Sequence, residues 1–144
     1  HLTEEERQNK IETETKLKGN DDKIKPPKYL SKEQKKIFKY IVSELIVADI
    51  LGNLDIYVLS TCSICIDRLQ EIEKLINHDV EKLSDRKLMG SRKDYQSDLF
   101  RCMNELSMTP QSRAKLGNLN MTVKQDAEDP LLQAVARLEG GKEE

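Results

Sequence analysis

The chain has 144 residues, of which 35% are charged and 4% aromatic, with no tryptophan and a net charge of −2. That length allows about one domain with a modest core, and so polar a composition leaves much of the chain to solvated surface or tails. No apolar run reaches the roughly 18 residues that a membrane-spanning helix needs, so we expect no membrane segment.

Residues 1–25 contain almost no apolar periodicity and are rich in Glu, Lys, Thr and Asn. This composition predicts a mobile or weakly helical charged arm. Pro26 and Pro27 end the arm and hold the chain extended before the first helix of the core.

Ser31 and Gln34 form the pattern of a capping box, which predicts that a helix begins here and runs to about Val47. Its apolar face consists of Ile37, Phe38, Ile41, Val42, Leu45 and Ile46. The opposite face carries Lys32, Lys35, Lys36 and Lys39. After Gly52 a second helix should fold back antiparallel to the first.

The uninterrupted segment from Asn53 to His78 predicts one helix roughly 35 Å long at 1.5 Å per residue. Asn53 is the expected N-cap, and Asp55 opposes the helix dipole in the first turn. The first half is apolar nearly all round, which is typical of a helix buried on every side. We interpret this helix as the spine of an oligomer. Six side chains should bury against neighbouring subunits or the first helix: Leu54, Ile56, Tyr57, Val58, Leu59 and Ile64.

The chain turns polar after His78, and residues 79–93 show no clear period, so we expect a loop with room for a short hairpin. A third helix is predicted over residues 94–107. Thr109 and Pro110 then give an N-cap followed by proline at the first helical position, which predicts a short helix over residues 110–116 that Gly117 closes.

Residues 118–128 read as a polar linker, and Asp129-Pro130 repeats the cap-plus-proline signal. The helix that follows has an apolar face made of Leu131, Leu132, Val135 and Leu138. A helix this short needs a surface to dock on, either on its own chain or on a partner protein.

Cys62 and Cys65 are spaced as a CxxC pair, and Cys102 is the third cysteine. Further zinc ligands are not close by, because His78 lies over three turns away, and no strand precedes the pair as in a thioredoxin-like motif. Buried helical thiols in a reducing, intracellular setting are the favoured interpretation. No phosphate loop or hydrolase motif is present, so we expect no enzyme activity, no metal and no cofactor.

Lysines are concentrated between Lys16 and Lys39, which makes this segment strongly positive in an otherwise acidic chain. Lysines on a helix face are commonly just solvated, but an oligomer would repeat them into a ring of charge that binds DNA phosphates. The candidate DNA-binding residues are Lys23, Lys25, Lys28, Lys32, Lys35, Lys36, Lys39, Arg92, Lys93, Arg113 and Lys115. A helix-turn-helix is disfavoured, because the second helix is too apolar at its start to read base edges.

Three features of residues 25–119 together resemble the P27 family of phage terminase small subunits. They are the run from Pro26 to Glu33 ahead of an amphipathic helix, Leu54-Asp55 at the start of a long helix, and LSMTPQSRAKL at residues 106–116. The last is similar to the family's closing motif, LGLTPxSRxRL. Ser107, Met108 and Lys115 replace its glycine, leucine and arginine.

Two departures from the family pattern concern the first and third helices. Phe38 stands where members often carry a tryptophan, and the Asn-Pro pair common before the third helix is absent around Asp94.

The residues and the resemblance together predict an all-α protein, an antiparallel helical hairpin with a long central helix and shorter C-terminal helices. The resemblance implies its assembly into a ring-like oligomer. Residues 1–25 would be the mobile charged arm and residues 26–117 the helical core for oligomerisation and DNA binding. Residues 118–144 would be the linker and amphipathic tail.

The resemblance also implies a non-catalytic packaging factor of a tailed phage or prophage. Such a factor binds double-stranded viral DNA in the host bacterial cytoplasm and recruits or regulates a large subunit that carries the ATPase and nuclease. The tail is assigned to the large subunit or the portal protein. Two alternatives stay open, namely a structural or adaptor oligomer that never touches nucleic acid and a phage-encoded DNA-binding regulator.

Overall fold

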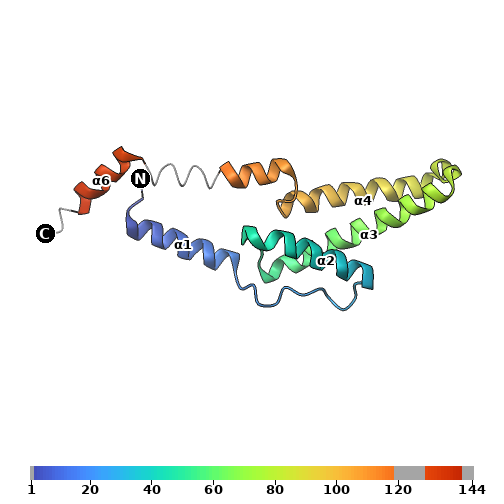
Figure 1. Ribbon diagram of the computed structural model, residues 1–144, viewed down its shortest axis with the longest axis horizontal. Coiled ribbons are helices and arrows are strands. Elements are labelled where there is room, and N and C mark those ends of the chain that lie inside the picture. Colours follow the sequence, from blue (N-terminus) through green and yellow to red (C-terminus); the bar gives the residue numbers. More distant parts are fainter. Residues whose placement is uncertain (1, 119–128, 141–144) are drawn as a thin grey trace. The chain divides into compact units, whose positions relative to one another are not determined.

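A computed structural model of the chain describes residues 2–118 and 129–140, and Figure 1 shows the course of the chain. Every regular element in these two ranges is a helix, which confirms the all-α class. Residues 18–108 form one compact unit, called here the helical body, and the other described residues are grouped apart from it. None of the described helices is long and apolar enough to cross a bilayer.

The N-terminal segment contains one helix, α1 (Glu4–Lys18), which has no buried residue. Three glutamates in its first turn favour helix formation through the helix dipole. The expected arm therefore has helical structure over most of its length, and its mobility stays a prediction.

The first helix of the body, α2 (Lys32–Leu45), begins at the predicted position because Ser31 caps it. The Ser31 Oγ accepts the Gln34 N–H at 3.2 Å, and the Gln34 Oε1 accepts the Ser31 N–H at 3.0 Å. This reciprocal pair is the predicted capping box, and it satisfies two backbone donors at the helix start. A short 3-10 helix, η1 (Ile46–Ala48), follows α2 and leads into the turn before the central helix.

The long central helix is confirmed, although it starts differently from the expectation. A 3-10 turn, η2 (Asn53–Asp55), precedes α3 (Ile56–His78). Asn53 is not the N-cap of α3, because α3 starts at Ile56 and Asp55 is the residue at its N-cap position. The Asp55 carboxylate accepts the Gly52 N–H at 2.8 Å. The side chain of Asn53 forms hydrogen bonds with residues about thirty positions earlier in the chain, which no local pattern reveals.

The prediction of a loop over residues 79–93 is wrong. The chain passes through a short 3-10 helix, η3 (Val80–Ser84), and α4 then runs over Arg86–Glu105, so it starts eight residues earlier than predicted. The Asp85 carboxylate caps α4 by accepting the Leu88 N–H at 3.0 Å. Most side chains in the first half of α4 are exposed, which is why this half shows no apolar period in the sequence.

The core of the body lies where α2 and α4 pack against α3, which runs antiparallel to both (Figure 1). Leu59 and Cys62 of α3 are fully buried and share one cluster with Phe38 of α2 and Cys102 of α4. The other buried members of that cluster are Leu30, Ile41, Leu51 and Leu106. The body is thus held by one small apolar core around the first half of α3.

Thr109 starts the next helix, over residues 110–118, as the cap-plus-proline signal predicts. Thr109 and Ser112 cap each other, because each hydroxyl accepts the other residue's backbone N–H, at 3.1 Å and 3.0 Å. Gly117 does not close this helix, contrary to the expectation, since residue 118 is still helical.

The last described element is α6 (Pro130–Gly140), whose start agrees with the second cap-plus-proline signal. The Asp129 carboxylate accepts the Leu131 N–H at 2.9 Å. Apart from its first residue, the linker expected over residues 118–128 lies outside the described residues.

Candidate nucleic-acid interface

The lysine-bearing face of α2 lies opposite the face that packs in the core. At 100° per residue its four lysines fall within about a third of the helix circumference. They are Lys32, Lys36 and Lys39, which are exposed, and Lys35, which is half-buried. Phe38 and Ile41 are buried on the other side, so packing fixes which way the lysines face.

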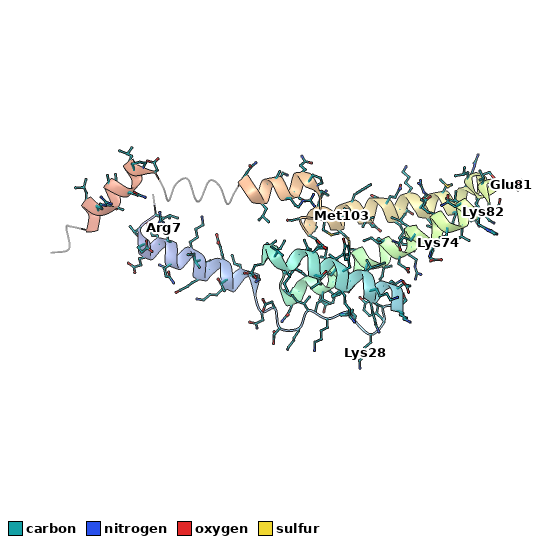
Figure 2. The ribbon with its side chains drawn as sticks, in the orientation of Figure 1. Arg7, Lys28, Lys74, Glu81, Lys82 and Met103 are labelled. Carbon is teal, nitrogen blue, oxygen red and sulfur yellow. The ribbon has the colours of Figure 1, made fainter. Side chains whose placement is uncertain are left out.

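Three further lysines stand on the extended segment that leads into α2. Lys23, Lys25 and Lys28 are exposed, and Figure 2 shows Lys28 projecting from this connection. Ile24 is packed against the core, and Leu30 is only 3% exposed. Because the apolar side chains anchor the segment, its lysines are left on the solvent side.

Residues 23–39 therefore form a continuous basic segment, called here the basic surface. It contains seven lysines and one glutamate, a net charge of +6, so the rest of the chain carries −8 of the total of −2. Lys36 pairs with Glu33 at 3.3 Å, and both side chains are more than 60% exposed, so this pair contributes little. The other six lysines form no ion pair within the described parts of the chain.

The remaining candidate cations lie elsewhere. Arg92 of α4 is engaged by Glu73 of α3, with 2.5 Å between the guanidinium Nε and the carboxylate, whereas Lys93 beside it is exposed. Arg113 and Lys115 are exposed on the helix over residues 110–118, outside the helical body. Seven of the eleven predicted cations thus lie in the basic surface.

The six residues expected at an oligomer interface divide into three groups. Leu59 is fully buried in its own chain, in the core between α2 and α3. Ile56, Val58 and Ile64 are half-buried. Leu54 and Tyr57 are 82% and 71% exposed.

Two exposed apolar side chains next to these escaped the sequence analysis. Ile46, expected on the packed face of the first helix, is 67% exposed, and Val47 is 89% exposed. Ile46, Val47 and Leu54 of the connection between α2 and α3, together with Tyr57 in the first turn of α3, are called here the apolar turn. Ile46 was expected to be packed because the helix period was extended to it, whereas α2 ends at Leu45 and Ile46 begins a 3-10 helix.

The three cysteines are buried, and none of them forms a disulfide with another described residue. Burial raises the pKa of the Cys62 thiol to about 12 and that of Cys65 to about 11, so neither is a thiolate near neutral pH. The Cys62 sulfur lies 3.9 Å from the sulfur of Met108. Among the described residues no three His, Cys, Asp or Glu side chains are grouped as metal ligands.

On the C-terminal helix α6, Leu131 and Leu138 are each 73% exposed and Val135 is 37% exposed. The side chain of Leu132 lies outside the described residues. The apolar face expected here is therefore uncovered where it is described.

A buried polar contact between α2 and α3 also escaped the sequence analysis. The Gln34 side-chain amide donates to the Asp67 carboxylate at 2.8 Å, and both residues are buried. Gln34 thus serves the capping box with its oxygen and α3 with its nitrogen. The contact fixes the first turn of α2, where the lysine-bearing face begins.

Comparison with known proteins gives one match. Residues 35–122, which is more than half of the chain, match the family described as phage terminase, small subunit. No curated protein and no solved structure matches. The matched region includes most of α2 and all of α3 and α4, the elements that form the core and carry the lysine-bearing face. The chain therefore belongs to the phage terminase small-subunit family.

Proposed function

We propose that this chain is the DNA-recognition component of a phage packaging machine and binds double-stranded viral DNA through the basic surface. Family membership supports genome packaging as the process. Six lysines that form no ion pair in the described chain would bind the DNA phosphates. Each lysine that neutralises a phosphate releases a counterion, so binding should be salt-dependent and tolerant of sequence.

The chain itself carries out no chemistry in this proposal. It recruits and regulates a large subunit, which holds the ATPase and the nuclease. The exposed apolar face of α6 is the surface offered to that subunit or to the portal protein. Assembly takes place in the cytoplasm of the host bacterium.

Assembly into a ring is part of the same proposal. The exposed side chains of the apolar turn support it, because four large exposed apolar residues, three in one short connection and one in the first turn of α3, favour burial against another copy. Repetition of the basic surface around a ring would multiply the number of phosphates held at once.

Within the family we place the chain in the P27 branch. The support is the segment of residues 106–116, whose backbone explains its motif. Ser107 has a left-handed backbone, with φ of 55°, at the position where the motif has glycine. Thr109 and Ser112 cap each other, which accounts for the Thr and Ser of the TPxSR element.

The test measures the affinity of the assembled full-length protein for duplex DNA by fluorescence anisotropy at several salt concentrations. The test variant replaces Lys32, Lys35, Lys36 and Lys39 by glutamine, which keeps helix propensity while removing four charges. We expect affinity to fall at least about tenfold and the salt slope to drop by about 0.9 for each phosphate that is no longer neutralised.

A matched control removes the same charge elsewhere. It replaces Lys10, Lys74, Lys82 and Lys87 by glutamine, and these lysines lie in α1, late α3, η3 and early α4. We expect its affinity to fall far less than that of the test variant. An equal decrease in both variants, or none in either, would show that the basic surface is not the DNA site.

A structural or adaptor oligomer is the second candidate, because the apolar turn favours assembly whether or not DNA is bound. Native mass measurement with and without duplex DNA separates the two. An oligomer of unchanged mass at low salt, with no bound DNA, would favour the adaptor. A regulator that reads bases is less favoured, because Leu59, Ser60, Cys62 and Ser63 near the start of α3 are buried.

A further inference from the structure

Asn53 attaches the backbone before the basic surface to the turn between α2 and α3, through its side chain and its backbone. Its amide oxygen accepts the Lys23 N–H at 2.8 Å, and its amide nitrogen donates to the Asp22 carboxylate at 3.0 Å. Its own backbone N–H donates to the Asn20 carbonyl at 2.7 Å. These three hydrogen bonds, called here the Asn53 clasp, join residues about thirty positions apart.

Two neighbouring contacts reinforce the clasp. The Lys18 ammonium lies 2.5 Å from the Asp49 carboxylate and 3.5 Å from that of Asp21. Gly52 lies against the Lys18 carbonyl so closely that a Cβ atom there would clash with the backbone oxygen. A side chain at position 52 would therefore push residues 18–20 away from the turn.

The clasp acts directly on the basic surface because Lys23 is a member of both. Beyond the clasp, Ile24 packs against the core and Leu30 is buried, so the segment is held at two ends. Lys25 and Lys28 lie between those anchors. Without the clasp, Lys23 would belong to a loose arm, whereas with it the extended segment is fixed to the same body as the lysines of α2.

We propose that Asn53 is a positioning residue for DNA binding: the Asn53 clasp holds the extended segment so that Lys23, Lys25 and Lys28 form one preorganised phosphate-binding surface with the lysines of α2. This inference rests on the proposed function. Its physical basis is entropy, because a segment that is already ordered need not be ordered when DNA binds.

The decisive experiment exchanges the two side chains of the clasp. Asn53→Asp alone sets two carboxylates against each other and removes the donor to Asp22. The double variant Asp22→Asn, Asn53→Asp restores a donor and an acceptor with their roles reversed and has the net charge of the original chain. Asn53→Ala removes the two side-chain hydrogen bonds of the clasp without a change of charge. Asn77→Asp, at an exposed site late in α3, controls for the added negative charge.

Hydrogen exchange reports on the clasp in the full-length protein without DNA. We expect the Lys23 and Asn53 amides to exchange at least about tenfold faster in Asn53→Ala and Asn53→Asp, and at nearly the original rate in the double variant. DNA affinity should follow the same order. It should be about tenfold weaker in the two single variants at Asn53, and within about twofold of the original in the double variant.

Rescue by the double variant separates positioning from direct binding. If exchange is restored and affinity is not, Asn53 or Asp22 touches DNA itself and the positioning role is wrong. If Asn53→Ala exchanges faster and binds DNA as well as the original chain, the inference alone fails. If the original chain binds no DNA, the proposed function fails and the inference fails with it.

Discussion

Ser107 adopts a backbone conformation that usually belongs to glycine. Its φ is 55°, and it follows the end of α4. The Met108 N–H donates to the Met103 carbonyl at 2.8 Å, and the Ser107 N–H donates to that of Asn104 at 3.3 Å. These are the two hydrogen bonds of a Schellman motif, in which a residue with a Cβ atom is strained.

Replacing Ser107 by glycine should therefore stabilise the protein, by about 1 kcal/mol, because the strain of the left-handed backbone is removed. The free energy of unfolding from urea denaturation measures it. The same substitution at Ser91, an exposed position inside α4, should destabilise by roughly 0.5 kcal/mol. Two changes of the same sign would show that the conformation of Ser107 does not matter.

The buried thiols give a pH dependence with a defined sign. Burial raises the pKa of Cys62 to about 12 and that of Cys65 to about 11, above their unfolded value of about 8.5. At a pH between the unfolded and the native pKa values, the thiols of the unfolded chain lose protons that those of the native protein keep. Stability is therefore fully present below about pH 8.5 and decreases as the pH rises toward the native pKa values.

Raising the pH from 7.5 to 9.5 should lower the free energy of unfolding by about 1 kcal/mol per thiol. Urea midpoints measured at both pH values test it. The double variant Cys62→Ala, Cys65→Ala should be less stable at pH 7.5 and should lose less stability on going to pH 9.5. An equal decrease in both proteins would assign the effect to other groups.

Among the contacts between elements, one buried hydrogen bond, from Gln34 to Asp67, joins α2 to α3 beside the apolar core. Asp67→Ala leaves the Gln34 amide without its partner in a buried position, which should cost about 1–3 kcal/mol. Asp67→Asn keeps an oxygen acceptor and should cost less. Asp94→Ala, at an exposed position of α4, is the control and should change the urea midpoint little.

In the molecule as a whole, the buried and the exposed apolar residues at the start of the central helix have different roles. Leu59 is fully buried, so Leu59→Asp should unfold the body and yield insoluble protein, and it cannot report on assembly. Leu54 and Tyr57 are exposed, so Leu54→Asp with Tyr57→Asp should leave the helical circular dichroism unchanged and reduce the mass found by light scattering. An unchanged assembly would place the interface outside the apolar turn.

The tail provides a second test at this scale. Removal of residues 129–144 takes away α6, whose described apolar side chains are exposed, and leaves the helical body intact. We expect DNA affinity to stay within about twofold, because the basic surface is retained, and binding of the large subunit to be abolished. Pull-down of the large subunit by the full and shortened chains measures it. Retained binding would move the partner surface to the body.

Prediction from the sequence succeeded where the signal is local. The capping box of Ser31, the cap-plus-proline starts of the last two helices and the length of the central helix depend on nearby residues and hydrogen bonds, which a short stretch of sequence displays. The basic segment of residues 23–39 can be recognised from the sequence because its lysines are close in sequence, and its role in DNA binding stays a prediction. The start of α4 was missed, since its largely exposed first half has no apolar period.

The all-helical class, the basic segment and the relationship to phage terminase small subunits can be read from the residues alone. The folded structure was needed to show that Leu59 belongs to the core while Leu54 and Tyr57 do not, and that Asn53 binds the segment of residues 20–23 and caps no helix. The two kinds of feature differ in the distance along the sequence between the residues that interact. Helix formation is decided within a few residues, whereas burial and the partner of a side-chain amide depend on segments that folding alone brings together.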